Sequence, residues 1–310
     1  MKRQGIRVSK SKGASLLETV ELLKSRIQTT EDLHSVVRTM KALAAVNIRQ
    51  LENAVESLAE YRRTVELGLR VVLSQGSGRA VLARESAQHS LGAIVFGSDQ
   101  GMCGQLNDQI AAYALKQMDS GDCASEDRTI LAVGSRVSAR LEDAGQRLEV
   151  TLPVASSLSG ITPLVQELLL HIDRWSSNQV VDHIVVFHCQ HLSRAAYVPC
   201  KFDLLPIDRH WLKSLTQEKW PTKILPTFTM NPEQLLSALV RQYLFISLYR
   251  ACAESLASEN ASRLVAMRGA ERNIGDKIEE LTRLFHQQRQ MAVTEELLDI
   301  VVGFEALAEN

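Results

Sequence analysis

Hydrophobic residues recur at a helical period at both ends of the chain. Between residues 15 and 75 the steps are mostly three and four, the pattern of one long amphipathic helix. Its apolar stripe comprises Leu16, Val20, Leu23, Ile27, Val37, Met40, Ala44, Leu51, Val55, Leu58, Val65, Leu69 and Val72. Between residues 232 and 310 the clearest stripe is Leu264, Met267, Glu271, Ile274, Ile278, Leu281 and Phe285, with Glu271 its polar member. Steps averaging 3.5 residues predict a coiled-coil seam.

Each of these helices needs a partner along its length. At ~1.5 Å per residue the first would run on the order of 90 Å. A helix gains little stability from propensity alone, so most of it must come from packing. Because the two helices stand at opposite ends of the chain, the simplest arrangement is an antiparallel pair. The alternative is two ordinary long helices packed on the region between them.

The middle of the chain alternates two kinds of pattern. Short apolar runs at 91–97, 129–135 and 181–189 predict buried strands, and stretches with helical spacing lie at 106–118, 135–144 and 161–175. Such alternation indicates an open, largely parallel sheet with helices on its faces. A final extended strand is expected after Cys189.

The predicted fold is therefore α/β, with a central Rossmann-like open domain and a long antiparallel coiled coil formed by the terminal helices. Its expected divisions are a basic flexible tail at 1–14, an N-terminal shaft helix at 15–75, a linker at 76–90, a central domain at 91–210, a connector at 211–231 and a C-terminal shaft helix at 232–310.

Composition supports this division. The 310 residues are 45% hydrophobic with a net charge of -1, which argues against disorder and against a generally basic nucleic-acid binder. All seven prolines fall between Pro153 and Pro232. The chain contains no apolar run of about 18 residues, so no membrane span is predicted. Glu18 and Glu21 interrupt the apolar block that a signal peptide would need. Five scattered cysteines without a CxxC pair favour free thiols in a reducing compartment.

Two clusters invite a chemical interpretation. The sequence GSDQGMCGQLN follows the first strand and opens a helix, where a phosphate loop would sit. Gly97, Gly101 and Gly104 do not form GxGxxG, and no Walker lysine follows, so a tight turn is favoured over nucleotide binding.

The second cluster is His183, His188 and His191. On a strand, His183 and His188 would face opposite sides, which disfavours a metal site. No catalytic signature stands out, and neither a metal nor a cofactor is predicted.

Three motifs, in order, resemble the gamma subunit of F-type ATP synthases. The C-terminal stretch is similar to that family's RQ-x-x-(I/V)-T-x-E-L-x-(D/E)-I-V pattern, with Arg289, Gln290, Val293, Thr294, Glu296, Leu297, Asp299, Ile300 and Val301. The turn after the first strand resembles S-D-R-G-L-C-G-x-L-N, with Ser98, Asp99, Gly101, Cys103, Gly104, Leu106 and Asn107. Leu204, Leu205 and Pro206 resemble its LLP.

The resemblance implies a non-catalytic rotor that transmits torque between ion flow through a membrane ring and ATP synthesis or hydrolysis. Its implied partners are alpha and beta nucleotide-binding subunits, three of each per copy of this chain, an epsilon subunit and the membrane c-ring, with no nucleic acid. The implied location is peripheral, on the cytoplasmic face of the bacterial inner membrane.

The same resemblance assigns three sets of site residues. The turn of the central domain comprises Ser98, Asp99, Gly101, Cys103 and Gly104. Contacts to the catalytic subunits fall on Met40, Arg289, Gln290, Thr294 and Glu295. The shaft tip, expected to turn in an apolar collar, comprises Val301, Val302, Phe304 and Leu307.

The N-terminal helix departs from the family pattern. Asp32, Leu33 and His34 replace the usual N-T-Q, Asn47 stands where lysine is common, and Glu295 replaces a common glutamine. These departures indicate a divergent branch, for which the alternative sodium-linked N-type ATPases are one candidate. Two rival interpretations stay open: an α/β enzyme, or a scaffold, dimerised by coiled-coil arms.

Overall fold

The structure is a computed structural model that describes residues 2–74, 90–121, 123–178, 181–193, 196–217, 220 and 226–308, without the side chains of 2–18, 125, 193 and 306–308. The chain divides into two compact units. The coiled-coil unit comprises Met1–Ala42 and Met267–Asn310, and the central unit comprises Leu43–Ala266. Helices α1 (Lys2–Ser74) and α6 (Pro232–Ala308) contribute to both units.

The central unit is organised around a five-stranded sheet. Its strands are β1 (Leu91–Phe96), β2 (Arg128–Val133), β3 (Leu148–Leu152), β4 (His183–Ser193) and β5 (Ala196–Leu205), in the spatial order β3-β2-β1-β4-β5. The first four strands run parallel, and β5 pairs antiparallel with β4. The predicted largely parallel sheet with a final extended strand is confirmed. Strand β3 was not predicted, because its five residues mostly alternate half-buried and exposed positions and form no apolar run.

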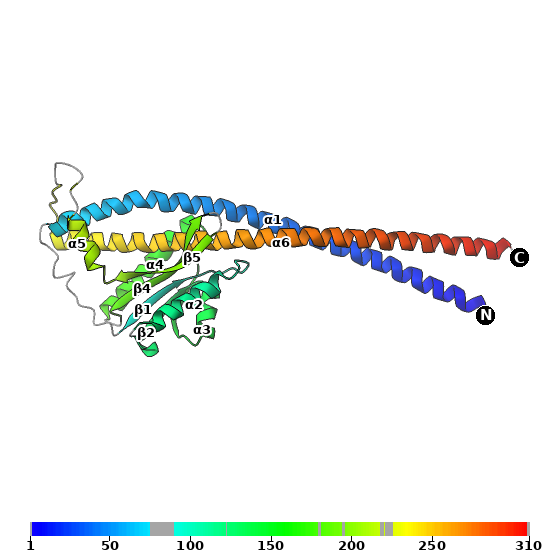
Figure 1. Ribbon diagram of the computed structural model, residues 1–310, viewed down its shortest axis with the longest axis horizontal. Helices are drawn as coiled ribbons and strands as arrows, with labels where there is room; N and C mark the ends of the chain where they lie inside the picture. The colour runs from blue at the N-terminus through cyan, green and yellow to red at the C-terminus, as the bar shows by residue number, and fades with distance from the viewer. Residues whose placement is uncertain are drawn as a thin grey trace. The chain divides into compact units, whose positions relative to one another are not determined.

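Helices cover both faces of this sheet (Figure 1). Helices α2 (Leu106–Asp119) and α3 (Ser135–Asp143) pack on one face, where Phe187 and Ile110 belong to one buried cluster. Helices α4 (Leu158–Ser177) and α6 pack on the other, where Ile94, Leu168 and Leu248 lie together. Burying each such side chain contributes ~1.5–3 kcal/mol. The long C-terminal helix is therefore one layer of the central domain's own core.

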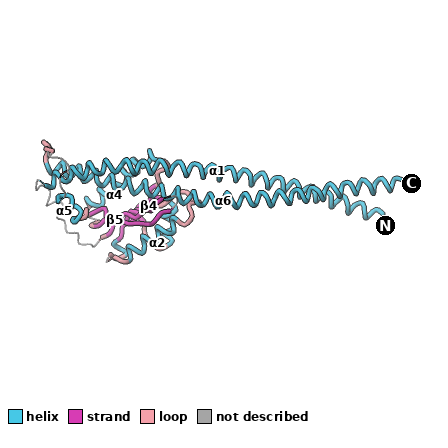
Figure 2. Tube along the Cα trace, turned by 45° about the horizontal axis from the view of Figure 1, so that its top comes forward, coloured by secondary structure: helices cyan, strands magenta, loops and turns pink. Residues whose placement is uncertain are grey.

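Within the central unit, α1 and α6 run antiparallel. The amide of Asn47 donates to that of Asn260 at 3.4 Å, and the Tyr61 hydroxyl donates to Gln242 at 2.8 Å. Residue numbers thus rise along α1 as those of their partners fall along α6. Figure 2 follows both helices beside the strands of the sheet.

The coiled-coil unit carries the predicted seam. Leu23 and Val37 from α1 are buried, as are Met267 and Leu281 from α6. Glu271 lies half-buried among them and forms ion pairs with Lys41 and, at 3.8 Å, with Arg38. The polar member of the stripe is therefore held by cations from the opposing helix.

The structure departs from the predicted divisions in two segments and describes little of a third. Residues 1–14 were expected to be a flexible tail, but α1 already begins at Lys2. Proline is absent there, and extending an existing helix adds one hydrogen bond per residue, so the helix can continue. The predicted connector at 211–231 contains most of a further helix, α5 (Arg209–Gln217). Of the predicted linker at 76–90, all but residue 90 lies outside the described residues.

Candidate functional site

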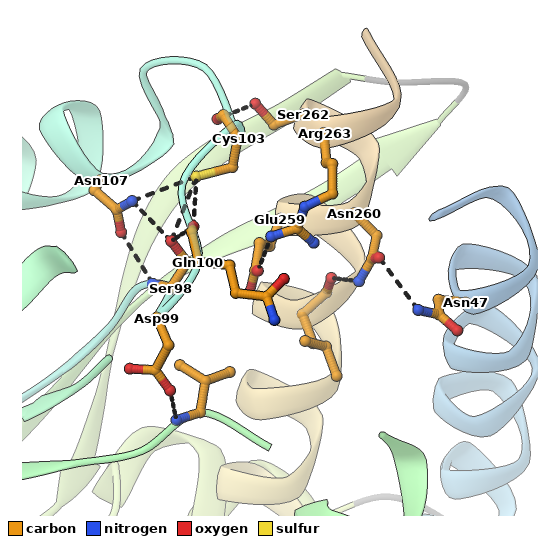
Figure 3. Close-up of polar contacts among 12 residues, drawn as sticks. Asn47, Ser98, Asp99, Gln100, Cys103, Asn107, Glu259, Asn260, Ser262 and Arg263 are labelled. Carbon is orange, nitrogen blue, oxygen red and sulfur yellow. Dashed lines mark hydrogen bonds and ion pairs between the residues drawn. The ribbon is translucent and has the colours of Figure 1, made fainter. Parts of the chain in front are cut away.

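The turn after β1 is closed by side chains of its own segment (Figure 3). Asn107, in the first turn of α2, accepts from the Ser98 amide at 2.9 Å and donates to the Ser98 hydroxyl at 2.8 Å. A Cβ on Gly97 would come within 2.4 Å of Val137, so only glycine allows this close approach. Gly104 has a φ of +58°, in the left-handed region that glycine adopts without strain.

Asp99 ties this turn to the neighbouring strand–helix connections. One carboxylate oxygen accepts from the Ser135 amide at 2.7 Å, at the start of α3, and the other accepts from the Val154 amide at 2.7 Å. The carboxylate therefore occupies the backbone donor at the start of α3, and its negative charge within the turn opposes an anion there. This arrangement supports the interpretation as a structural turn.

The turn and strand β4 are fastened to α6 by polar contacts. The Ser262 hydroxyl donates to the Cys103 carbonyl, and the Ser258 hydroxyl donates to the Cys189 carbonyl at 2.9 Å. His188 on β4 lies 2.9 Å from the Glu254 carboxylate, which also accepts from Arg250 at 2.6 Å. Figure 3 shows the contact between Ser262 and the turn.

Two buried carboxyl groups on α6 respond differently to their surroundings. Burial raises the pKa of Glu254, but hydrogen bonds from His188 and Arg250 outweigh it, and the pKa lies below its usual value. For Glu259, burial dominates over the neighbouring Arg263 and raises the pKa of the carboxyl. Glu254 is thus held as a carboxylate within a network.

The three histidines of β4 interact with three different carboxyl groups. His183 lies 3.0 Å from Asp203 on β5, His188 contacts Glu254 on α6, and His191 lies 3.2 Å from Glu52 on α1. Across the part of the chain that the structure describes, no group of three His, Cys, Asp or Glu side chains could hold a metal ion. These histidines instead connect β4 to neighbouring elements.

The cysteines are all free thiols. Burial raises the pKa of both Cys189 and Cys252 to about 12, and that of Cys200 to about 11. Thiols with such pKa values stay protonated at neutral pH and are poor nucleophiles.

The residues expected to contact catalytic subunits all belong to the coiled-coil unit. Arg289, Gln290 and Thr294 are exposed on α6, whereas Glu295 is half-buried. Met40 is half-buried on α1, one residue from Lys41, which pairs with Glu271. Position 289 lies 18 residues beyond position 271, or about 27 Å along the helix. The structure therefore separates Met40 from the cluster on α6.

The expected shaft tip is strongly exposed. Val301 is 52%, Val302 61% and Phe304 75% exposed. Leu307 lies in α6, but its side chain is outside those described. Among the described residues, no helix combines the length and the apolar character needed to cross a bilayer.

The polar residues that fasten α6 to the central domain were not predicted from the sequence. Glu254, Ser258 and Ser262 recur at intervals of four, so they lie along one side of the helix. The regular spacing of these polar residues was the signal that the sequence offered.

Comparisons with known proteins agree with one another. A family model described as ATP synthase matches residues 19–307. The ATP synthase gamma chain of Nostoc punctiforme is 26% identical, over 94% of this chain and 100% of its own length. The ATP synthase gamma chain of Nitrosomonas europaea is 24% identical, over 92% of this chain and 98% of its own.

Two solved structures share the fold. A chain from the mitochondrial ATP synthase of Euglena gracilis, in an assembly of OSCP, F1 and c-ring, has a TM-score of 0.59 at 18% identity, covering 94% of this chain and 95% of that one. A chain from the central stalk and c-ring of the Tetrahymena thermophila mitochondrial enzyme has a TM-score of 0.55 at 19% identity, covering 76% and 99%.

Proposed function

The chain belongs to the ATP synthase family, and from this premise we propose that it is the gamma chain, the central-stalk subunit of an F-type ATP synthase. In this role it is non-catalytic and transmits torque between ion flow through a membrane ring and nucleotide chemistry on other subunits. One copy would assemble with three alpha and three beta subunits, an epsilon subunit and the c-ring.

The observation that carries this proposal is the exposed apolar end of α6. Val302 and Phe304 leave most of their side-chain surface accessible, at 61% and 75%, within the coiled-coil unit. A monomeric protein rarely leaves such residues grouped without a partner. A surrounding apolar collar would cover them, and because hydrophobic contact is non-directional, the helix could still turn inside it.

The exposed polar cluster about two to three turns earlier suits contact with the catalytic subunits. Arg289, Gln290 and Thr294 are exposed, and the Thr294 hydroxyl donates to the Gln290 carbonyl at 2.8 Å. An arginine offers five donors in a fixed geometry that matches carboxylates. Glu295 lies toward the seam and Met40 at another level of the shaft, so we propose that these two contribute at the edges of this surface.

Rotation of such a shaft can bias catalytic sites without chemistry on this chain. Since two antiparallel helices are not three-fold symmetric, three surrounding catalytic subunits would each meet a different face. Each subunit's nucleotide affinity then shifts according to the contacts it receives.

The energy for this movement would come from ion flow at the other end of the complex. One charge crossing 100 mV supplies ~2.3 kcal/mol, so several ions must act mechanically before one ATP forms. We propose that the central α/β domain sits on the membrane ring, on the cytoplasmic face of a bacterial inner membrane, and receives this torque.

The test is Arg289→Ala in the reassembled complex, with Arg283→Ala as the matched control, since both arginines are exposed on α6. The expected result is reduced ATP turnover and ion pumping for Arg289→Ala alone, with the isolated chain folded in both variants. Wild-type coupling in Arg289→Ala would reject the contact assignment.

The mass of the wild-type complex tests the larger proposal. A homodimer of this chain, in place of one copy with three of each partner, would reject it.

A further inference from the structure

Three polar side chains of α6 form a ridge directed at the central domain. Glu254, Ser258 and Ser262 are 7%, 0% and 7% exposed, and they stand four residues apart. Each interval of four advances ~6 Å along the helix and turns it ~40°. The ridge therefore spans about 12 Å while staying on one side of α6.

Every member of the ridge reaches a fixed point on the α/β domain. Glu254 contacts the His188 ring at 2.9 Å. The Ser258 hydroxyl is shared between the carbonyl of the adjacent Cys189 at 2.9 Å and the Glu254 carbonyl of its own helix at 2.8 Å. Ser262 contacts the Cys103 carbonyl in the turn after β1. Two of the three partners on the α/β domain are backbone carbonyl oxygens, which cannot move without moving the strand or the turn.

The surrounding packing does not fix the helix in the same way. Residues such as Leu248, Ala251 and Ala257 bury apolar surface against the sheet. Apolar burial depends on area and has little directional preference, so it resists separation more than sliding or turning. Hydrogen bonds weaken steeply when they bend, so three of them along 12 Å resist axial sliding and rotation of α6 together.

The neighbouring polar groups strengthen this joint. Arg250 donates to the second oxygen of Glu254 at 2.6 Å, so both carboxylate oxygens are engaged. The turn that carries Cys103 is braced by Asn107 through the Sγ atom of Cys103 at 3.4 Å and the Ser98 hydroxyl at 2.8 Å. A force on α6 at Ser262 is therefore passed to the sheet through a rigid turn.

We infer that Glu254, Ser258 and Ser262 are the torque-bearing joint of this subunit, positioning residues that fix the rotational register of the α/β domain on α6. This inference rests on the proposed rotor function. If torque enters at the α/β domain, it must cross to α6 without slippage, and the ridge provides directional contacts across that boundary.

The test measures the stiffness of the joint in the assembled complex. The end of α6 is cross-linked to the catalytic subunits, a gold bead is attached to the α/β domain, and the thermal angular spread of the bead is recorded. The variant is Ser258→Ala with Ser262→Ala. Removing two of three directional contacts is expected to widen the angular variance at least about twofold.

Ser255→Ala is the matched control. Ser255 is 3% exposed on the same helix, and its hydroxyl has no hydrogen-bond partner among the described residues. The control should keep the wild-type variance, because its hydroxyl fixes nothing. If the double variant does not assemble, Ser262→Ala alone is measured and is expected to give a smaller widening.

The outcomes separate the two claims. A rotating wild-type complex whose variant keeps the same angular variance overturns the joint and leaves the rotor proposal standing. A wild-type complex that hydrolyses ATP while the bead never rotates, before cross-linking, overturns the rotor proposal itself. The inference about the joint is also overturned if Ser255→Ala widens the angular variance equally, because truncation of any buried side chain would then loosen the domain.

Discussion

Replacing Asp99 with asparagine tests whether the turn after β1 is a structural brace. Each carboxylate oxygen of Asp99 accepts from a backbone amide at 2.7 Å, one at Ser135 and one at Val154. Asparagine has nearly the same shape but only one acceptor oxygen. Its amide nitrogen would therefore face one of these backbone donors.

The expected cost is about 2 kcal/mol. A hydrogen bond to a charged group contributes roughly 1.5–3 kcal/mol, and the lower part of that range applies because Asp99 and Val154 are only half-buried. Loss of the negative charge near the start of α3 adds about 0.3–1 kcal/mol. For a domain of roughly 150–250 residues, each 1 kcal/mol shifts the midpoint of thermal unfolding by about 2–4 °C, so a fall of about 4–8 °C is expected.

The assay is thermal unfolding followed by circular dichroism, with Asp208→Asn as the control. Asp208 accepts from the His210 amide at 2.7 Å in an exposed position before α5. Asparagine serves equally well at such a helix start, so the control should change the midpoint little. An Asp99→Asn protein as stable as the wild type would refute the account of the turn as a brace.

Three further predictions concern other parts of the chain. Because the folded-state pKa of Glu254 is lowered, its stabilising contribution should be present above the unfolded pKa and lost as the pH falls through the folded pKa. Glu254→Gln should therefore reduce the fall in the free energy of unfolding at acid pH, measured by urea titration. An unchanged fall would contradict this prediction. Cys189 and Cys252, whose pKa values are about 12, should resist iodoacetamide at pH 7 until the chain unfolds, and rapid labelling in the native protein would count against their burial. Met267→Ala should destabilise the coiled-coil unit by about 2–5 kcal/mol in hydrogen exchange of the α6 amides, whereas Met291→Ala, at an exposed site, should not.

The elements with a strong period could be predicted from sequence. The seam stripe from Leu264 to Phe285 predicted a buried line, and Met267 and Leu281 are buried in it. The apolar runs that became β1, β2 and β4 were also recognised, since parallel strands covered on both faces are apolar throughout. Strand β3 was missed because it is only five residues long and has no apolar run.

The polar joint could not be predicted in the same way. Serines at 258 and 262 gain their role only from the carbonyls of Cys189 and Cys103, which lie 69 and 159 residues away in sequence. Likewise, pairing of His188 with Glu254 depends on β4 lying against α6, and neither the strand nor the helix alone contains that information. Local patterns fix elements, whereas such contacts depend on the tertiary arrangement.

Recording rotation in the complete complex tests the central claim most directly. The nucleotide-binding subunits are fixed to a surface, a bead is attached to the α/β domain of this chain, and ATP is added. The account predicts sustained rotation in one direction that stops when ATP is exhausted. ATP hydrolysis by a complex that contains this chain, with the bead fluctuating about one fixed angle, would contradict it.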